Sequence, residues 1–352
     1  MVLVRRRWCA WGLGAGAAVA LARWWPPLTA ALPLLGLVAL ARAAAAGAAT
    51  WLATALPRRP LRDLRRRAVL VTGCDSGFGH EAALRFHALG APVFAGVLLP
   101  QGPGAARLRQ MASPRMRVLP LDVTDEGSVA EARRAVDQFL SEGDCELWAV
   151  VNNAGVLGVG EAEWMEMEDV KKCMDVNAFG QVRVTKAFLP LLKKSKGRVI
   201  NINSQASTIV APTINPYTMS KFASLAYTDS LRYDMEKFSI SVHSIEPAMY
   251  RTPLVQSTIS VCKQKLKQIP NDVRNTYCEH YEQKFLKLHY LSLHLTAMPQ
   301  SRTFQVVDAI EDACFDKDPQ DTYIPGEGSK FTSSIKDILP FLASFTSKIL
   351  YR

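Results

Sequence analysis

Cysteine pairs are missing from this sequence. The 352-residue chain has 7 cysteines, an odd number, and no two of them form a C-x-x-C pair. Thiols scattered in this way provide neither the framework of a disulfide-stapled domain nor the ligands of a structural zinc site. We therefore expect no metal site, and free thiols in a reducing compartment at Cys9, Cys74, Cys145, Cys173, Cys262, Cys278 and Cys314.

The body of the chain also has no excess of charge. The net charge of +10 arises entirely from residues 1–67, which hold 11 arginines and the single acid Asp63; the remaining residues hold as many basic as acidic side chains. A nucleic-acid-binding domain needs its basic excess on the folded domain itself. The neutral body therefore excludes nucleic acid as the partner.

Serine and lysine are absent from residues 1–67, which consist mainly of apolar runs. One run spans 8–22, and a longer one spans 28–56 with Arg42 as its single interruption. The longer run exceeds the roughly 20 residues that a helix needs to cross a bilayer. Five of the 7 tryptophans lie in this segment, mostly near the ends of the runs, as in residues that sit at membrane interfaces. We predict a membrane anchor over residues 1–67.

Six arginines directly after the longer run favour keeping that end on the cytoplasmic side: Arg58, Arg59, Arg62, Arg65, Arg66 and Arg67. The alternative is a cleaved mitochondrial presequence, which is also rich in arginine and poor in acids. The absence of serine and the uniformly apolar runs argue against that alternative.

From Ala68 onward, short β-branched or apolar runs alternate with helical patterns. This alternation predicts an α/β fold with a doubly wound, parallel, seven-stranded Rossmann sheet over residues 68–330. Ligands of such sheets bind at the carboxyl ends of the strands. The predicted strands span 68–72, 92–97, 116–121, 147–152, 198–203, 240–246 and 322–324.

A glycine-rich turn follows the first predicted strand. It reads T-G-x-x-x-G-x-G, with Gly73, Gly77 and Gly79 around Asp75, Ser76 and Phe78. Glycines at a turn between a strand and a helix let backbone N–H groups approach a pyrophosphate, and the helix dipole favours that anion. We expect this turn to bind the phosphates of a dinucleotide.

The second strand lacks the residue that usually selects the cofactor. Many nicotinamide-binding folds carry an acid about 20 residues past the glycines, which binds the ribose 2′-hydroxyl. Here the strand runs from Val93 into Leu98 and Leu99, and the next basic residue is Arg107. The residues alone leave NAD and NADP both open.

The ends of the third and fourth strands carry further polar residues. Asp122 follows the third strand and is predicted either to cap the helix that begins near Asp125 or to contact the cofactor. The fourth strand ends in N-N-A-G, where side-chain amides can stabilise the sheet and the glycine lets the backbone pass close to a cofactor. The cofactor-binding candidates there are Asn153, Ala154 and Gly155.

Tyr217 and Lys221 form a pair with the spacing of one helical turn. Four residues apart, the phenol and the ammonium lie on one helix face. A nearby fixed cation favours the phenolate and lowers the tyrosine pKa toward a range useful for a base. Ser204 lies 13 residues upstream at the end of a predicted strand, and Asn177 lies farther upstream.

These motifs together resemble the short-chain dehydrogenase/reductase family, from about residue 67 to residue 330. The resemblance implies the catalytic set Asn177, Ser204, Tyr217 and Lys221. In it, Tyr217 exchanges the alcohol proton and Ser204 hydrogen-bonds the reacting oxygen. Lys221 lowers the tyrosine pKa and binds the nicotinamide ribose, while Asn177 holds a water that links Lys221 to solvent.

The same resemblance assigns the rest of the cofactor site. Asp122 contacts the adenine, Thr252 lies near the nicotinamide carboxamide, and Pro247 is a further cofactor-binding residue. The chain departs from the family at two positions: Ala248 replaces the usual glycine, and Asn203 stands where relatives commonly have serine. The steroid and retinol dehydrogenase branch, which is most similar, favours NAD.

The apolar anchor and the resemblance lead to one functional prediction. We expect an NAD-dependent oxidoreductase in the endoplasmic reticulum membrane that interconverts an alcohol and a carbonyl on an apolar substrate, a steroid or a retinoid. The alternatives are a mitochondrial D-3-hydroxybutyrate dehydrogenase and a non-catalytic nucleotide-binding scaffold. Membrane lipid is an expected partner, and a homo-oligomer is left open.

Two C-terminal segments complete the prediction. Residues 253–300 are the least regular part of the body and are expected to cover the substrate. Their histidines, His280, His289 and His294, have no metal-ligand spacing and are expected to be surface or packing residues. Residues 331–352 are apolar, and they either dock on the membrane or pack on the domain.

Overall fold

The structure is a computed structural model that describes residues 60–61, 63–111, 113–277, 280–291, 293–294 and 297–326. The predicted membrane runs and the C-terminal segment 331–352 lie outside these residues. No helix in the described part has the length and apolar character required to cross a membrane.

The described chain contains the predicted seven-stranded parallel sheet, in the order β3-β2-β1-β4-β5-β6-β7. Every strand boundary lies within one residue of its prediction. The order reverses between β1 and β4, so a crevice opens at their carboxyl ends. The strands are β1 (Arg67–Val71), β2 (Val93–Val97), β3 (Met116–Pro120), β4 (Glu146–Asn152), β5 (Arg198–Ile202), β6 (Ser241–Ile245) and β7 (Thr322–Tyr323).

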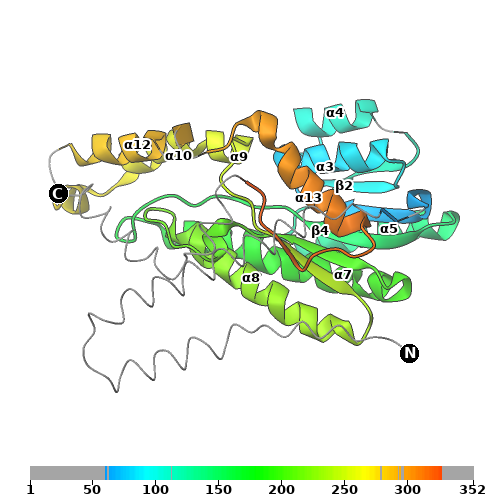
Figure 1. Ribbon diagram of the computed structural model, residues 1–352. Coiled ribbons are helices and arrows are strands. Elements are labelled where there is room, and N and C mark those ends of the chain that lie inside the picture. Colours follow the sequence, from blue (N-terminus) through cyan, green and yellow to red (C-terminus); the bar gives the residue numbers. More distant parts are fainter. Residues whose placement is uncertain are drawn as a thin grey trace, which may run out of the picture. The chain divides into compact units, whose positions relative to one another are not determined.

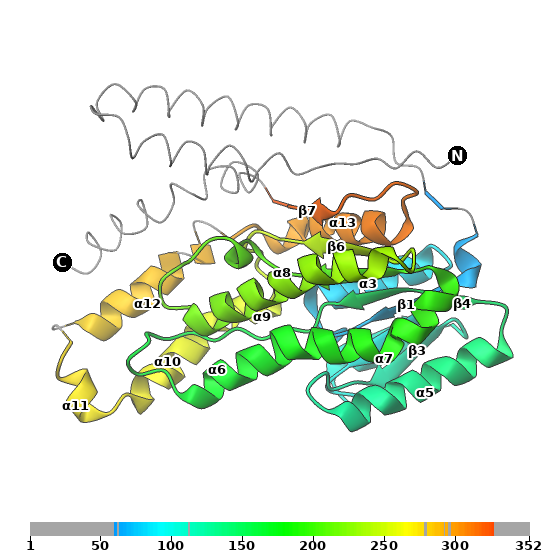
Figure 2. The same ribbon diagram turned by 90° about the horizontal axis from the view of Figure 1, so that it is seen from below.

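Helices cover both faces of the sheet, which is why the central strands are apolar throughout (Figures 1 and 2). One face packs on α3 (Gly77–Ala88), α4 (Pro103–Met111) and α13 (Phe304–Phe315) through a core that includes Phe86 and Ile310. The other face packs on α5 (Glu126–Glu142), α7 (Gly180–Ser195) and α8 (Asn215–Glu236) through a core that includes Phe188 and Leu231.

A smaller helical group follows β6 and extends away from the sheet (Figure 1). It comprises α9 (Pro253–Gln256), α10 (Thr258–Gln268), α11 (Asn271–Arg274) and α12 (Tyr281–Leu291). This group has its own apolar cluster, in which Phe285 and Leu266 pack against Trp164. Short 3-10 turns at Leu64–Arg66, Gln205–Ser207 and Gln300–Arg302 connect the larger elements.

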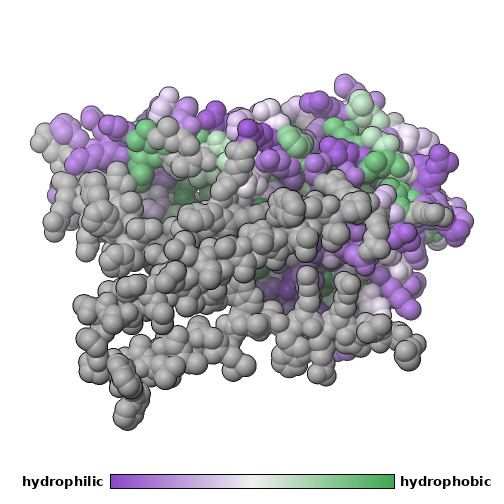
Figure 3. All heavy atoms as spheres, in the orientation of Figure 1, coloured by the Kyte–Doolittle hydropathy of each residue, from purple (hydrophilic) through white to green (hydrophobic). Residues whose placement is uncertain are grey.

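The surface over α3 and α4 shows hydrophobic and hydrophilic side chains intermixed (Figure 3). Leu98, Leu99 and Met111, around the two ends of α4, are among the exposed large apolar residues. All the cysteines in the described residues are free thiols, as expected: Cys74, Cys145, Cys173, Cys262 and Cys314.

Candidate active site

The glycine-rich turn lies between β1 and α3, where Ser76 is the residue that precedes the helix. Gly73 and Gly77 have φ values of 67° and 62°, which disfavour residues with a side chain. A Cβ atom on Gly73 would also lie 2.8 Å from the Cα of Ala154. The turn therefore brings backbone N–H groups and the start of α3 to the edge of the sheet, as the sequence predicts.

Gly79 serves a different purpose from the other two glycines. A Cβ atom there would lie 2.3 Å from Nδ2 of Asn153. That amide donates to the backbone oxygens of Thr72 and Gly73 at 2.9 and 3.1 Å, so it ties the end of β4 to the turn. Gly79 lies behind the turn and does not border the cavity described below.

β2 has no acid of its own at its carboxyl end, but the side chain of Asp75, from the glycine-rich turn, lies next to that end. Its carboxylate accepts hydrogen bonds from the backbone N–H groups of Leu98 and Leu99, at 2.9 and 2.8 Å. A negative charge is therefore present beside β2 although it comes from the glycine-rich turn. Sequence spacing did not reveal this contact, because it joins residues 23 and 24 positions apart.

Of the two roles predicted for Asp122, helix cap or cofactor contact, the structure tests only the first. The cap of α5 is Asp125, whose carboxylate accepts from the N–H groups of Gly127 and Ser128. Asp122 instead accepts from the N–H and hydroxyl of Thr124, at 2.9 and 2.7 Å, and borders the cavity. The capping interpretation is therefore wrong for Asp122, and its contact with adenine stays a prediction.

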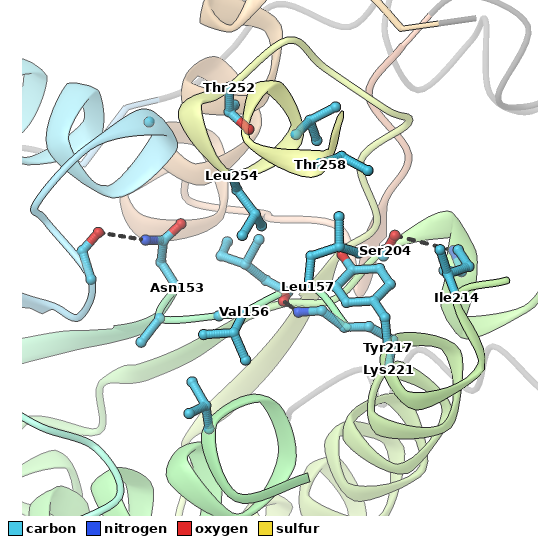
Figure 4. A pocket seen from close by; sticks show the side chains of 18 of the residues that line it. Asn153, Val156, Leu157, Ser204, Ile214, Tyr217, Lys221, Thr252, Leu254 and Thr258 are labelled. Carbon is cyan, nitrogen blue, oxygen red and sulfur yellow. Dashed lines mark hydrogen bonds between the residues drawn. The ribbon is translucent and has the colours of Figure 1, made fainter. Parts of the chain in front are cut away.

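Ser204, Tyr217 and Lys221 come together on one side of the cavity, while Thr252, Leu254 and Thr258 come from the chain after β6 (Figure 4). Ser204 follows β5, and Tyr217 and Lys221 lie on α8. The Lys221 ammonium donates to the backbone oxygen of Ile202 at 2.7 Å and lies 5.8 Å from the centre of the Tyr217 ring.

The electrostatics of this group differ from the expectation in one respect. Burial raises the pKa of Tyr217 above its ordinary value, and a hydrogen bond with Ser204 only partly offsets that rise. Burial also lowers the pKa of Lys221 to about 8. The net shift of the Tyr217 pKa is therefore upward, opposite to the predicted lowering, because desolvation of the phenolate outweighs the favourable contacts.

Asn177 lies in a π-helical turn, Asp175–Phe179, between α6 (Met167–Met174) and α7. Such turns are frequent at functional sites. Its Nδ2 donates to the Val156 oxygen and to the Ser220 hydroxyl, both at 2.9 Å, and its Oδ1 accepts from the Val156 N–H at 2.8 Å. Both amide hydrogens are therefore used within the protein. A water that links this residue to Lys221 stays a prediction.

A single cavity of about 1460 Å³ joins these groups. Of the predicted site residues, all except Gly79 and Asn177 border it. We call the part bordered by 73, 75–78, 121–124 and 153–155 the strand-end half, and the part bordered by 209, 211–214, 253–255, 258, 288–289 and 293 the insert half.

His289 was missed at this site by the sequence analysis. It is buried, borders the cavity from α12, and its Nε2 lies 3.1 Å from the hydroxyl of Thr213. Burial lowers the pKa of His289 to about 4, so the ring is neutral at physiological pH. Helical spacing could not distinguish this buried residue from His294, which is exposed.

The residues of the strand-end half fit a nicotinamide dinucleotide. Side chains at Gly73 or Gly77 would strain the turn whose N–H groups are expected to bind a pyrophosphate. The cavity continues from this turn to Tyr217 and Lys221 without interruption, so a long ligand bound there would reach the catalytic group. Pro247 and Thr252 border the same cavity, and their contact with a cofactor stays a prediction.

Comparison with known proteins now decides the family. The family model "short chain dehydrogenase" matches residues 67–262. The chain belongs to the short-chain dehydrogenase family. It is an oxidoreductase that acts on CH–OH groups, and NAD or NADP is the cofactor of this family.

Curated relatives share more than a third of their aligned residues with this chain. It is 36% identical to human 17-beta-hydroxysteroid dehydrogenase type 2, over 82% of this chain and 74% of the relative. It is 36% identical to mouse retinol dehydrogenase 5, over 74% and 81% respectively. It is 38% identical to the mitochondrial D-beta-hydroxybutyrate dehydrogenase of rat, over 63% and 67%.

Solved structures share the fold. A short-chain dehydrogenase from Burkholderia cenocepacia in complex with NADP has a TM-score of 0.57 at 20% identity, covering 82% of this chain and all of that one. A 3-ketoacyl-(acyl-carrier-protein) reductase from Brucella melitensis complexed with NADH has a TM-score of 0.51 at 25% identity, covering 57% of this chain and 83% of that one. Both cofactors thus occur on this fold.

Proposed function

We propose that this enzyme oxidises a hydroxyl group on an apolar molecule, a steroid or a retinoid, with NAD as hydride acceptor. The observation that carries the proposal is the cavity, in which the Ser204, Tyr217 and Lys221 group opens directly onto the apolar insert half. A site of about 1460 Å³ is larger than the usual range for one small ligand, as expected if it holds a dinucleotide and a bulky substrate together.

The insert half favours an apolar substrate. Ile209, Ile214, Leu254, Leu288 and Leu293 border it. Its polar members, such as Thr213 and His289, are uncharged, and their side chains bond to each other. A small hydroxy acid would need a cation for its carboxylate. In the described residues no lysine or arginine borders the insert half; the lysines of the cavity are Lys221 in the catalytic group, and Lys171 and Lys172 on α6. These features support a steroid or retinoid over D-3-hydroxybutyrate.

In the proposed reaction Tyr217 accepts the proton of the substrate hydroxyl, and Ser204 holds the reacting oxygen. Lys221 has a pKa of about 8 and is therefore mostly charged at neutral pH, where it stabilises the phenolate that oxidation requires. NAD, when bound, supplies the hydride acceptor. The protein supplies position, desolvation and proton transfer.

The preference for NAD over NADP is supported by Asp75. Its carboxylate lies on the N–H groups of Leu98 and Leu99, beside the end of β2. In this fold that strand end faces the ribose of the adenosine. A 2′-phosphate there would meet a like charge, whereas a 2′-hydroxyl would meet a hydrogen-bond acceptor.

The location proposed for the enzyme is the endoplasmic reticulum membrane, with a membrane lipid environment and residues 1–67 as the anchor. The support is the pair of apolar runs with their tryptophans and flanking arginines. Residues 68–330 then form the catalytic domain, with 253–300 over the substrate and 331–352 as an apolar tail. Carbonate or high-salt extraction of membranes tests the anchor: the full chain should stay in the pellet until detergent is added.

The function itself is tested by NAD reduction in a membrane fraction, with estradiol, retinol and D-3-hydroxybutyrate assayed in parallel. The Tyr217→Phe variant serves as the control. We expect turnover of estradiol or retinol, and its loss in the variant. Turnover of D-3-hydroxybutyrate alone would assign the enzyme to ketone-body oxidation, and NAD binding without turnover of any alcohol would indicate a scaffold.

A further inference from the structure

Asn203 is a buried polar residue that directly precedes Ser204. It is only 2% exposed. Its Nδ2 donates to the Thr228 hydroxyl at 3.2 Å and to the Ser244 hydroxyl at 2.9 Å, while its Oδ1 accepts from the Ser224 hydroxyl. All its side-chain polar groups therefore have protein partners, and it touches two other structural elements.

The partners of Asn203 require the chemistry of an amide. The Thr228 hydroxyl already donates to the Ser224 backbone oxygen at 2.7 Å, and the Ser244 hydroxyl donates to Glu246 at 3.0 Å. Both hydroxyls can therefore only accept from residue 203. Serine has one hydrogen and cannot serve both acceptors, and aspartate has none to donate.

Two of the elements joined by Asn203, the end of β5 and α8, carry the catalytic group. Ser224 and Thr228 lie on α8, three and seven residues after Lys221, and thus near the same helix face. Ser244 lies on β6, and the backbone N–H of Asn203 donates to Ile245 of that strand at 2.7 Å. One side chain therefore fixes the end of β5 against both α8 and β6.

We propose that Asn203 is a positioning residue that holds Ser204 in register with Tyr217 and Lys221. This inference rests on the catalytic roles given under the proposed function. The side chain acts through the elements it joins, because its polar atoms are all engaged within the protein. A misplacement of about 1 Å between reacting groups costs on the order of a hundredfold in rate.

The test compares Asn203→Leu, which keeps the number and branching of the side-chain heavy atoms, with Thr185→Val. Thr185 is also fully buried, and its hydroxyl accepts from Asn152 at 2.9 Å, but it lies on α7. Asn203→Leu removes three buried hydrogen bonds and Thr185→Val removes the bond with Asn152, so both should lower the melting temperature. We expect kcat to fall about tenfold or more in Asn203→Leu alone, with KM for NAD nearly unchanged.

Asn203→Ser provides a graded variant, since serine can donate to only one acceptor. Its kcat should fall between those of the wild type and Asn203→Leu. Displacement of the catalytic group should also shift the pH profile of kcat/KM in both variants, which a loss of stability alone would not do. Equal kcat in Asn203→Leu and Thr185→Val, measured where both are folded, would overturn the proposal.

If Asn203→Leu does not fold, Ser224→Ala and Ser244→Ala each remove one partner of the same side chain. We expect a severalfold loss of kcat in each, and an unchanged kcat in both would overturn the proposal. Tyr217→Phe in the same assay separates the two claims. If Tyr217→Phe remains active, the proposed catalytic roles fail; if only the Asn203 variants remain active, the positioning role fails alone.

Discussion

The strand-end half and the insert half of the cavity are built by different means. Backbone forms much of the strand-end half, where glycine conformation and the Asn153 amide fix the path of the chain. Side chains of helices form most of the insert half, where Phe285 and its neighbours hold α12 by apolar packing. We propose that the first half binds the nicotinamide cofactor, which the family shares, and that the second half is free to differ between substrates.

The largest difference should appear where the halves meet, at Tyr217. Tyr217→Phe should lower kcat by about 10² to 10⁴-fold, because general acid–base catalysis contributes that much. NAD binding should change little, since the strand-end half is intact. Steady-state kinetics and an NADH fluorescence titration measure the two effects. A loss of NAD affinity as large as the loss of kcat in Tyr217→Phe would contradict the separation of cofactor binding from catalysis.

The pH dependence of kcat/KM should be set by the ionisation of the Tyr217 phenol. Burial raises the pKa of Tyr217, so its protonated form dominates at neutral pH. Oxidation needs the deprotonated form, and its kcat/KM should therefore rise with pH, by up to about tenfold per unit. Reduction needs the phenol and should not rise. Above the Lys221 pKa of about 8, loss of the ammonium charge should flatten the oxidative profile. Initial rates from pH 6 to 10 in both directions check these slopes.

Gly79→Ala should damage the strand-end half alone. The added Cβ would lie 2.3 Å from Nδ2 of Asn153 and 2.7 Å from the Gly73 oxygen, so the tie between β4 and the turn must shift. Overpacking of this kind costs roughly 1 to 3 kcal/mol. We expect NAD to bind about tenfold more weakly.

Gly127→Ala is the matched control for Gly79→Ala. Its Cβ would lie 3.4 Å or more from its nearest neighbours in the first turn of α5. Alanine favours a helix over glycine, so stability should rise slightly and NAD affinity should not change. Similar NAD affinities in the two glycine variants would refute the packing argument.

Asp75→Asn should alter cofactor choice while keeping the shape of the turn. Removing the negative charge beside Leu98 and Leu99 should raise the ratio of kcat/KM for NADP over NAD by about fivefold. The ratio measured with one alcohol and both cofactors decides this. An unchanged ratio would show that Asp75 does not select the cofactor.

The smallest effect should come from an ion pair between α10 and α6 that does not border the cavity. Lys265 of α10 lies 2.5 Å from the Asp169 carboxylate on α6, and this ion pair is partly exposed. Such pairs contribute about 0 to 1 kcal/mol. Lys265→Met should therefore raise KM for the alcohol about twofold without changing KM for NAD. Equal changes in the KM for the alcohol and the KM for NAD would contradict the separation of the two halves.

The positions of the residues in the strand-end half could be predicted from the sequence, because particular backbone conformations require particular residue types, such as glycine at positive φ. Glycine spacing and the N-N-A-G end of β4 reflect local conformational needs, and the spacing of Tyr217 and Lys221 on α8 does the same for the catalytic group. The seven strands were equally visible, since strands covered on both faces are continuous apolar runs. The prediction grouped Gly79 with the glycines expected to bind phosphate, because spacing cannot tell a turn position from a packing position.

The insert half and the electrostatics could not be predicted in the same way. His289 and Thr213 meet from segments 76 residues apart, and no local pattern records that contact. The pKa of Tyr217 depends on burial as well as on neighbouring charge, and burial is a property of the assembled cavity. Asn203 was visible as a departure from the family, but its partners on α8 and β6 were not.

The most direct test of the account follows the hydride. Estradiol or retinol deuterated at the carbinol carbon is incubated with NAD and the membrane-bound enzyme, and the reduced cofactor is analysed by mass spectrometry. The account predicts NADH that carries one deuterium, formed by the wild type and not by Tyr217→Phe. Deuterium transfer from D-3-hydroxybutyrate in the absence of any transfer from the two apolar alcohols would contradict it.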